Sequence, residues 1–315
     1  MSTATAPGKI ILFGEHAVVY GRPAIAAPVS QLRATAVVKP ANQPGIRLIA
    51  PDLNQDMMLT EAEPEDPIAA VIKQLQTAIN LPHLPDLIIT VSSAIPIASG
   101  LGSGAAITAA VIRALANYLG LGHLATDEWV SAQTYEIEKI HHGTPSGIDN
   151  TVVAYERPVF FVRQQPHNRI ETFSVAQALH LLVGDTGLSS STKLVVGDVR
   201  RQWEADCPKF EAIFDGCGRI ATAARLAIEE GNLTAVGRLM NENHTLLQQM
   251  SVSSPELDGL VTAANKAGAL GAKLSGAGRG GNMIALVTSE SKAAVQSALQ
   301  TAAAKTILSS AIEPQ

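Results

Sequence analysis

The chain has 315 residues, of which 46% are hydrophobic and 16% are charged, and its formal net charge at neutral pH is −5. This composition is ample for a folded core and argues against an intrinsically disordered chain. The weakly acidic balance also argues against a basic surface that would bind nucleic acid or an anionic membrane.

The chain carries no sequence feature of secretion or of a membrane anchor. Its two cysteines, Cys207 and Cys217, match no disulfide or metal-binding pattern, so we expect reduced thiols and a cytoplasmic protein. The first residues lack the basic and apolar regions of a signal peptide. No residue from Leu87 to Ile112 is charged, but Pro96 and a glycine-rich run interrupt that stretch, so we expect no membrane span.

The N-terminal part is expected to be rich in strands. IILFGEHAVVYGRPAIAAPV (10–29) reads as two short buried strands around Gly14 and Gly21, and LRATAVVK (32–39) alternates as a strand does. The proline- and aspartate-rich segment that follows predicts a strand edge and an exposed loop. After it we expect a helix over 68–80 and a strand within 84–96 that runs into a turn.

Two further helices are predicted in the middle of the chain. AAITAAVIRALANYLG (105–120) has apolar residues on one face and ends at a glycine. Thr126, followed by two acidic residues, marks the start of a helix that continues through 129–140. HGTPSGIDN (142–150) is then interpreted as a loop, and TVVAYERPVFFVR (151–163) as a return to strand.

The C-terminal part is expected to be largely helical. A short strand over 180–187 precedes amphipathic helices near 210–230, 232–250 and 255–268. A pair of strands, 272–278 and 282–288, and a last helix over 290–303 complete the pattern. We place a domain boundary near residue 183, so that the expected domains are 1–183 and 184–315.

PIASGLGSGAAITAA (96–110) places three glycines and a serine between a strand and a helix. Small residues let backbone amides approach a phosphate, and a helix N-terminus adds partial positive charge. The loop lacks the Gly-Lys-Ser/Thr ending of a Walker A motif, and no acidic residue follows at the spacing of a dinucleotide fingerprint. On these residues alone, a tight turn without a ligand stays open.

A second glycine run, KLSGAGRGGNMIAL (273–286), lies between two apolar strands. A backbone-lined pocket and a strained hairpin explain it equally well. Two such runs in one chain favour a nucleotide-binding protein.

Four segments, in this order, resemble the conserved blocks of the GHMP small-molecule kinases: PGKIILFGEHAVVYG (7–21), PIASGLGSGAA (96–106), HGTPSGIDN (142–150) and KLSGAGRGG (273–281). The first and third are most similar to the mevalonate kinase branch of that superfamily. The resemblance implies an α+β protein with the two-domain GHMP kinase fold. Its N-terminal domain would be like domain 2 of ribosomal protein S5, and its C-terminal domain would be ferredoxin-like.

The resemblance also implies ATP-dependent phosphorylation of the 5-hydroxyl of (R)-mevalonate, with Mg²⁺ as cofactor. It places Asp149 beside the acceptor hydroxyl, with Lys9 in contact with it as the second catalytic residue. Local sequence alone would favour Asp149 as a loop-capping aspartate. Glu138 and Ser103 would bind the metal, although Glu138 could also be a solvated helix residue.

The resemblance assigns two sets of binding residues. The ATP contacts would be Pro96, Ser99, Gly100, Leu101, Gly102, Ser103, Gly104 and Ala105. The substrate contacts would be Lys9, Glu15, His16, Asp149, Thr192, Gly276 and Ala277, with Arg163 as our candidate for the substrate carboxylate.

Two positions depart from the family pattern, and two consecutive histidines raise the question of a metal site. Families of this type usually read GLGSS, but Gly104 replaces the second serine, which puts metal affinity in doubt. Arg279 stands where glycine is common and would face phosphate or solvent. Consecutive residues such as His141 and His142 point apart, so we interpret them as loop histidines.

The resemblance leaves alternatives open. Another GHMP kinase, acting on phosphomevalonate, homoserine or a sugar, is the nearest, and a catalytically silent ligand-binding sensor is the other. The expected partner is the small molecule mevalonate, with no nucleic acid and no membrane. Oligomeric state stays open, with a homodimer as the common arrangement.

Overall fold

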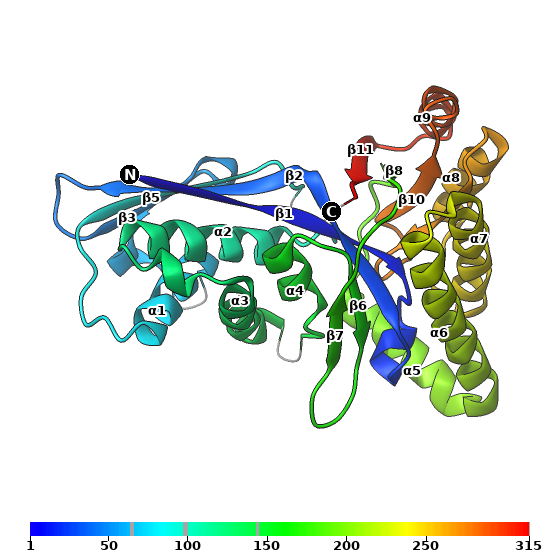
Figure 1. The fold of residues 1–315 in the computed structure, drawn as a ribbon, viewed down its shortest axis with the longest axis horizontal. Coiled ribbons are helices and arrows are strands. Elements are labelled where there is room, and N and C mark those ends of the chain that lie inside the picture. Colours follow the sequence, from blue (N-terminus) through cyan, green and yellow to red (C-terminus); the bar gives the residue numbers. More distant parts are fainter. Residues whose placement is uncertain (64–65, 97–99, 143–144, 315) are drawn as a thin grey trace. The chain divides into compact units, whose positions relative to one another are not determined.

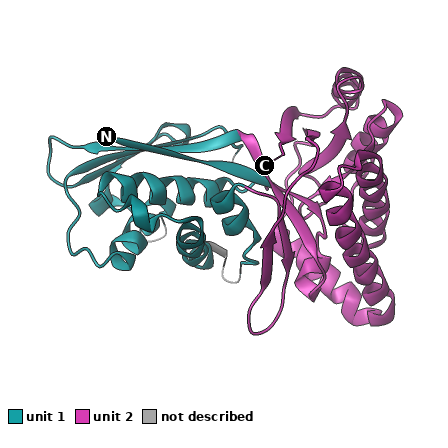
Figure 2. Cartoon of the chain, viewed as in Figure 1, with its two compact units in different colours: residues 1–9, 32–97, 101–156 teal, residues 10–31, 98–100, 157–315 magenta. Residues whose placement is uncertain are grey.

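The structure of the chain, a computed structural model, describes residues 1–63, 66–96, 100–142 and 145–314. By internal contacts the chain forms two compact units, coloured separately in Figure 2. Unit 1 comprises residues 1–9, 32–97 and 101–156, and unit 2 comprises 10–31, 98–100 and 157–315. The domain boundary expected at residue 183 remains a proposal.

Unit 1 contains a sheet and four helices. Its strands follow the order β4-β3-β5-β2, and β1 also pairs with β2. β5 is parallel to β3 and antiparallel to β2. The strands are β1 (Ser2–Phe13), β2 (Ala24–Pro40), β3 (Ile46–Ala50), β4 (Gln55–Met58) and β5 (Leu87–Ser93), of which β1 and β2 continue into unit 2.

The helices of unit 1 cover one face of this sheet (Figure 1). They are α1 (Pro67–Ala78), α2 (Ser103–Tyr118), α3 (Asp127–His142) and α4 (Ile148–Tyr155). α2 packs against the other three, and most of its buried side chains are alanines, which let neighbouring helices approach closely. The expected helices at 68–80, 105–120 and 129–140 are confirmed as α1, α2 and α3.

Unit 2 contains an antiparallel sheet of order β11-β8-β10-β9 and the remaining helices. The first residues of β2 also pair there with β6, which pairs with β7. Its elements are β6 (Val159–Val162), β7 (Arg169–Thr172), β8 (Leu179–Asp185), α5 (Thr192–Ala205), α6 (Cys207–Glu229), α7 (Leu233–Gln249), α8 (Pro255–Lys266), β9 (Gly271–Ser275), β10 (Asn282–Val287), α9 (Lys292–Thr301) and β11 (Thr306–Ile312).

One apolar core joins the sheet of unit 2 to its helices. Phe210 and Phe214 of α6, Leu247 of α7 and Leu274 of β9 are buried together in it. The predicted strands and helices beyond residue 180 are confirmed, whereas β11 was not expected from the sequence. The α+β class is therefore confirmed.

The segment 151–163 was expected to be a strand, but residues 151–155 are the end of α4. Gly147 adopts φ 92°, which allows the sharp turn into the helix, and the hydroxyl of Thr151 donates to its carbonyl oxygen at 2.7 Å. Val152 and Val153 are buried, so packing overrides their preference for strands. Asp149 consequently lies in the first turn of a helix, where its negative charge is favourable, and not in a loop.

The N-terminal strands were also predicted too short. β2 has 17 residues and includes both AIAAPV and LRATAVVK, which the sequence suggested as separate strands. Between β1 and β2 the chain forms a 3-10 helix, Ala17–Tyr20. Among the described residues, no helix combines the length and the apolar character that crossing a membrane requires.

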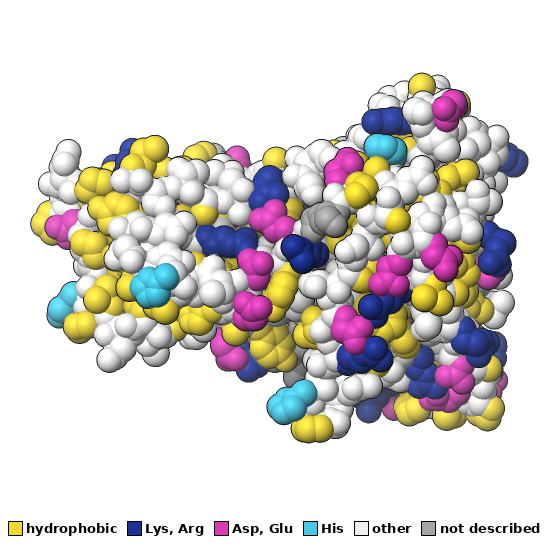
Figure 3. Space-filling view, viewed as in Figure 1, with side chains coloured by type: hydrophobic (Ala, Val, Ile, Leu, Met, Phe, Trp, Pro, Cys, Tyr) yellow, Lys and Arg dark blue, Asp and Glu magenta, His cyan; other side chains and the backbone are white. Residues whose placement is uncertain are grey.

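Charged side chains of both signs lie interspersed over unit 2 on the face seen in Figure 3. The ion pairs of this unit include Arg225 with both Glu171 and Glu229, and Arg200 with Glu204. The visible face therefore carries mixed charge, as the sequence composition suggests.

Candidate active site

Lys9 and Asp149 form an ion pair within unit 1. The ammonium of Lys9, on β1, lies 3.1 Å from Oδ2 of Asp149, in the first turn of α4. Lys9 is buried, whereas 30% of the Asp149 side chain is exposed. A carboxylate held by a cation yet open on one side is suited to receive a polar group of a ligand.

The first turn of α4 is anchored to α3 by Asn150. Its side-chain amide donates to the carbonyl oxygen of Ser131 at 3.2 Å and to the hydroxyl of Ser131 at 2.9 Å. Both residues are buried, so these bonds are protected from water. The residue next to Asp149 therefore fixes the position of that carboxylate relative to α3.

α3 contributes a second carboxylate, that of Glu138. Burial raises the pKa of Glu138 to about 8, and the negative charge of Asp149 acts in the same direction. The Lys9 ammonium and the backbone N–H of Asn150 act in the opposite direction. Oε2 of Glu138 is buried and has no hydrogen-bond partner among the residues described. A buried, unpartnered carboxylate oxygen next to other charges is a candidate ligand for a cation.

The glycine loop touches the same lysine. The backbone N–H of Lys9 donates to the carbonyl oxygen of Leu101 at 2.8 Å. A Cβ added to Gly102 would lie 2.7 Å from Cγ of Lys9, which is too close. Gly102 also has φ 75°, so both the close contact and the backbone conformation require glycine. The loop and the ion pair therefore belong to one site.

α2 begins at Ser103, directly after this loop. Ser103 is half-buried, Gly104 is exposed and Ala105 is buried. A Cβ added to Gly104 would meet no atom within 4 Å, so the missing serine side chain leaves open space. Of the other expected ATP contacts, Pro96 and Gly100 are exposed, and Ser99 lies outside the described residues.

The residues present fit Mg²⁺ and a phosphate chain. The N-terminus of a 16-residue helix preceded by glycines is a suitable anion site. The unpartnered oxygen of Glu138 is the hard ligand that Mg²⁺ prefers, and binding of the ion would release the proton that the raised pKa retains at pH 7. No group of three or more histidine, cysteine or acidic side chains that could hold a metal occurs within the described part of the chain.

In unit 2, Glu15 is held by a lysine that the sequence did not single out. The ammonium of Lys273, on β9, forms an ion pair with Glu15 and donates to the carbonyl oxygen of Leu274 at 2.6 Å. Both side chains are almost fully buried. The available signal was a lysine in an otherwise apolar strand, GAKLS, where a buried charge requires a partner.

His16 lies next to the second glycine run. Its Nε2 is 2.9 Å from the carbonyl oxygen of Ala277, which follows Gly276. Burial lowers the pKa of His16 to about 4, the hydrogen bond with Ala277 opposes this shift, and the positive charge of Arg279 lowers it further. His16 is therefore neutral at pH 7 and can act as a hydrogen-bonding group.

Arg279 does not simply face solvent. Its guanidinium forms an ion pair with Asp198 of α5 and donates from Nε to the carbonyl oxygen of Ser251 at 3.1 Å. Its φ is 55°, a left-handed conformation that explains why glycine would be accommodated easily at this position.

The remaining expected substrate contacts are on the surface. Arg163 is exposed directly after β6, and Thr192 is exposed at the first residue of α5. Neither has a hydrogen bond or ion pair with another expected site residue among the interactions of the described residues. His141 and His142 are the last two residues of α3, so the prediction that they lie in a loop is wrong. Their side chains lie outside the described part of the chain.

Comparison with known proteins gives consistent matches along the chain. The sequence models of the GHMP kinase N-terminal and C-terminal domains match residues 67–157 and 224–305. A mevalonate kinase of Thermococcus sibiricus is 39% identical over 303 residues, which cover 90% of this chain and 88% of that protein.

Solved structures agree with the sequence matches. The structure of L. major mevalonate kinase in complex with R-mevalonate has a TM-score of 0.86 and 31% identity, covering 100% of this chain and 97% of that one. Methanococcus jannaschii mevalonate kinase has a TM-score of 0.86 and 28% identity, with 99% and 98% covered. The chain thus has the fold that its sequence motifs suggested.

Proposed function

This chain belongs to the GHMP kinase family, and on that premise we propose that it phosphorylates the 5-hydroxyl of (R)-mevalonate with ATP. The product is 5-phosphomevalonate, an intermediate of isoprenoid biosynthesis. The observation that carries the proposal is the ion pair of Lys9 and Asp149 beside the glycine loop, at 3.1 Å. The choice of acceptor is supported by the mevalonate kinases that the chain is similar to.

Asp149 handles the acceptor hydroxyl in the proposed reaction. The hydroxyl donates a hydrogen bond to the carboxylate, its oxygen forms a bond to the γ-phosphorus, and the proton passes to Asp149 and then to solvent. The bond from the γ-phosphorus to the bridging oxygen breaks, and ADP leaves. Lys9 fixes the carboxylate and stabilises the negative charge that develops on the oxygens.

The residues around the Lys9–Asp149 pair are proposed to bind ATP, the phosphate donor. The backbone amides at the start of α2, from Gly102 to Ala105, bind phosphate oxygens. Glu138 and Ser103 would hold Mg²⁺, and the ion would supply positive charge that neutralises the phosphate groups. Because Oε2 of Glu138 is otherwise unpartnered, metal binding would satisfy it.

Residues of unit 2 are proposed to bind the acceptor. His16 offers a neutral imidazole, and Gly276 and Ala277 offer backbone groups. Glu15, held by Lys273, and the exposed Thr192 complete the polar contacts. Arg163 is the proposed partner of the substrate carboxylate, since a guanidinium can bind a carboxylate through two hydrogen bonds.

A coupled assay of ADP release, with ATP and Mg²⁺, tests the function. It compares mevalonate, phosphomevalonate, homoserine and galactose as acceptors, for the wild type and for Asp149→Asn. Asp56→Asn is the matched control, because Asp56 also pairs with a basic side chain of unit 1 but lies on β4. Turnover of mevalonate alone, lost only in Asp149→Asn, supports the proposal. No turnover of any acceptor, with ATP still bound, would replace it with a ligand-binding sensor.

Two properties of the protein in solution are further proposals. We place it in the cytoplasm, since both cysteines are free thiols. We propose a homodimer as its assembly, which light scattering of the purified chain would test by its mass.

A further inference from the structure

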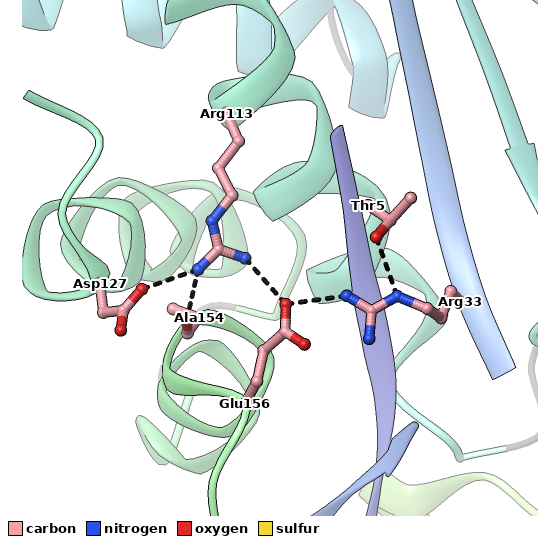
Figure 4. A network of polar contacts seen from close by, with 6 residues as sticks. All are labelled: Thr5, Arg33, Arg113, Asp127, Ala154 and Glu156. Carbon is pink, nitrogen blue, oxygen red and sulfur yellow. Dashed lines mark hydrogen bonds and ion pairs between the residues drawn. The ribbon is translucent and has the colours of Figure 1, made fainter. Parts of the chain in front are cut away.

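A network of polar side chains in unit 1 connects the elements that carry the proposed active-site residues (Figure 4). We propose that its central residue, Arg113, is a positioning residue that sets the relative placement of Lys9, the glycine loop, Glu138 and Asp149. The inference rests on the roles proposed above for those residues. The network, here called the Arg113 network, consists of Thr5, Arg33, Arg113, Asp127, Ala154 and Glu156.

Arg113 joins three helices through one guanidinium. It projects from α2, donates to Oδ1 of Asp127 in the first turn of α3 at 2.9 Å, and donates to the carbonyl oxygen of Ala154 near the end of α4. It also lies 3.5 Å from Oε1 of Glu156. Only 16% of its side chain is exposed. A guanidinium has five N–H donors in fixed geometry, so a lysine ammonium would not reproduce these contacts.

Glu156 extends the network to the strands. Oε1 of Glu156 accepts from Arg33 of β2 at 2.8 Å, and Arg33 donates from Nε to the hydroxyl of Thr5 on β1 at 2.9 Å. Lys9 lies on that same strand, four residues further along. The network therefore includes β1, the strand that carries Lys9, and β2, the strand that pairs with β1.

Each of the helices α2, α3 and α4 has a proposed functional residue or loop at the end that is distant from the Arg113 network. The glycine loop precedes Ser103, about 15 Å along α2 from Arg113 at 1.5 Å per residue. Glu138 is a similar distance from Asp127 along α3. Asp149 is in the first turn of α4, while Ala154 is in its last turn. A rigid helix transmits a shift at one end to the other, so the network sets the geometry of the site.

α4 depends on such contacts more than a long helix would. It has eight residues, too few for a helix that is stable by itself. Its C-terminal cap is Glu156 in the left-handed conformation, with φ 54°, where glycine or asparagine is usual. A strained glutamate at this position persists because its carboxylate is bound by Arg33 and lies beside Arg113. The ion pairs of the Glu156 carboxylate therefore offset the strain of its left-handed backbone conformation.

The test compares Arg113→Met and Glu156→Asn with Arg47→Met. Asparagine keeps the left-handed backbone at 156 but loses the carboxylate. Arg47 is the matched control, because it binds both oxygens of Asp56 at 2.7 Å within unit 1, but between β3 and β4, which carry no proposed site residue. Arg113→Lys retains the positive charge but not the guanidinium geometry, and it shows whether the charge alone maintains kcat.

We expect kcat for mevalonate to fall about 10- to 100-fold in Arg113→Met and Glu156→Asn, with KM changed less than about threefold, since small displacements of reacting groups reduce rate more than binding. Arg47→Met should stay within about twofold of the wild type. Retained kcat in Arg113→Met, or an equal loss in Arg47→Met, would overturn the inference.

Amide hydrogen exchange provides a readout that requires no substrate. In Arg113→Met and Glu156→Asn, the amides of residues 150–153 should exchange at least about tenfold faster than in Arg47→Met, because α4 loses its C-terminal anchor. Unchanged exchange there contradicts the inference even if the wild type phosphorylates mevalonate. Faster exchange in these two variants, found together with a wild type that is inactive on mevalonate, would reject the proposed function and retain the network's structural role. If Arg113→Met fails to fold, Glu156→Asn decides both readouts.

Discussion

The ammonium of Lys273 and the carboxylate of Glu15 form an ion pair in which the two side chains are 0% and 1% exposed. They come from opposite ends of the sequence, and both lie in unit 2. Burial lowers the pKa of Lys273 below its usual value, and the charge of Glu15 acts in the opposite direction. Each charge is therefore tolerated because the other is present.

This relationship predicts strong coupling between the two positions. Lys273→Met would leave a buried carboxylate without its cation and should cost about 3–5 kcal/mol of unfolding free energy, as should Glu15→Leu. The double variant, with both charges removed, should cost less than the sum by about 2 kcal/mol or more. Urea unfolding of the four proteins measures this cycle. Additive single effects would show that the pair is not coupled.

His16 predicts a loss of stability in acid. Its pKa is lowered to about 4 in the folded protein, against 6.5 for the free side chain, so between these values only the unfolded chain binds the proton. Stability from this residue is fully present above pH 6.5 and is lost as the pH falls toward 4, by about 1.4 kcal/mol per unit.

His16→Asn isolates that contribution, because asparagine tolerates the φ of 60° at this position and does not titrate. Urea unfolding at pH 7 and pH 5 should show a smaller decrease for the variant than for the wild type. Burial also lowers the pKa of His244, which is unchanged in the variant, so the difference between the two proteins reports His16 alone. If stability decreased equally in both proteins, His16 would bind its proton at pH 5 in the folded as in the unfolded chain, and its pKa would not be lowered by folding.

The two cysteines should react very differently with alkylating reagents. Cys207 is exposed, whereas Cys217 is buried and its pKa is raised to about 12, by burial and by the negative charge of Glu15. The thiolate is the reactive form, so Cys217 should stay unmodified at pH 8 in the folded protein. Mass spectrometry after iodoacetamide treatment should find one modified residue, and two only after unfolding. Modification of Cys217 in the folded protein would contradict its described burial.

The sequence predicted most helices because their apolar periodicity is strong and their caps are local. α8, for example, begins after Ser254, whose hydroxyl caps the backbone N–H of Leu257. α4 was mistaken for a strand, since TVVAYE is rich in β-branched residues and only its packing makes it helical. β11 was missed because a strand at the end of a sheet depends on pairing with the distant β8.

The motifs single out Lys9, Asp149 and Glu138 as candidates, and their roles remain proposals. Lys273 and Arg113 were not predicted to have particular roles, because their importance lies in partners 258 and up to 43 residues away. An alternating strand or an amphipathic helix does not indicate which charged residue will be buried against which partner. Such pairings follow from tertiary structure alone.

A serine at position 104 is expected to strengthen binding of Mg²⁺. Gly104 is exposed in the first turn of α2, and a Cβ there would meet no atom within 4 Å, so serine fits without displacing a neighbour. Serine also has a higher helix propensity than glycine, by about 0.5 kcal/mol. The hydroxyl would restore the GLGSS pattern of related families and add an oxygen ligand near the proposed metal site.

Gly104→Ser should therefore lower the Mg²⁺ concentration required for half-maximal activity by about 3- to 10-fold, since one additional oxygen ligand strengthens binding. Gly104→Ala is the control, because it adds a Cβ and a larger gain in helix propensity, about 1 kcal/mol, without a ligand atom. Titration of activity with Mg²⁺ at saturating ATP distinguishes them. If alanine and serine act alike, the effect is one of helix stability, and water already supplies the oxygen that the missing serine would have given.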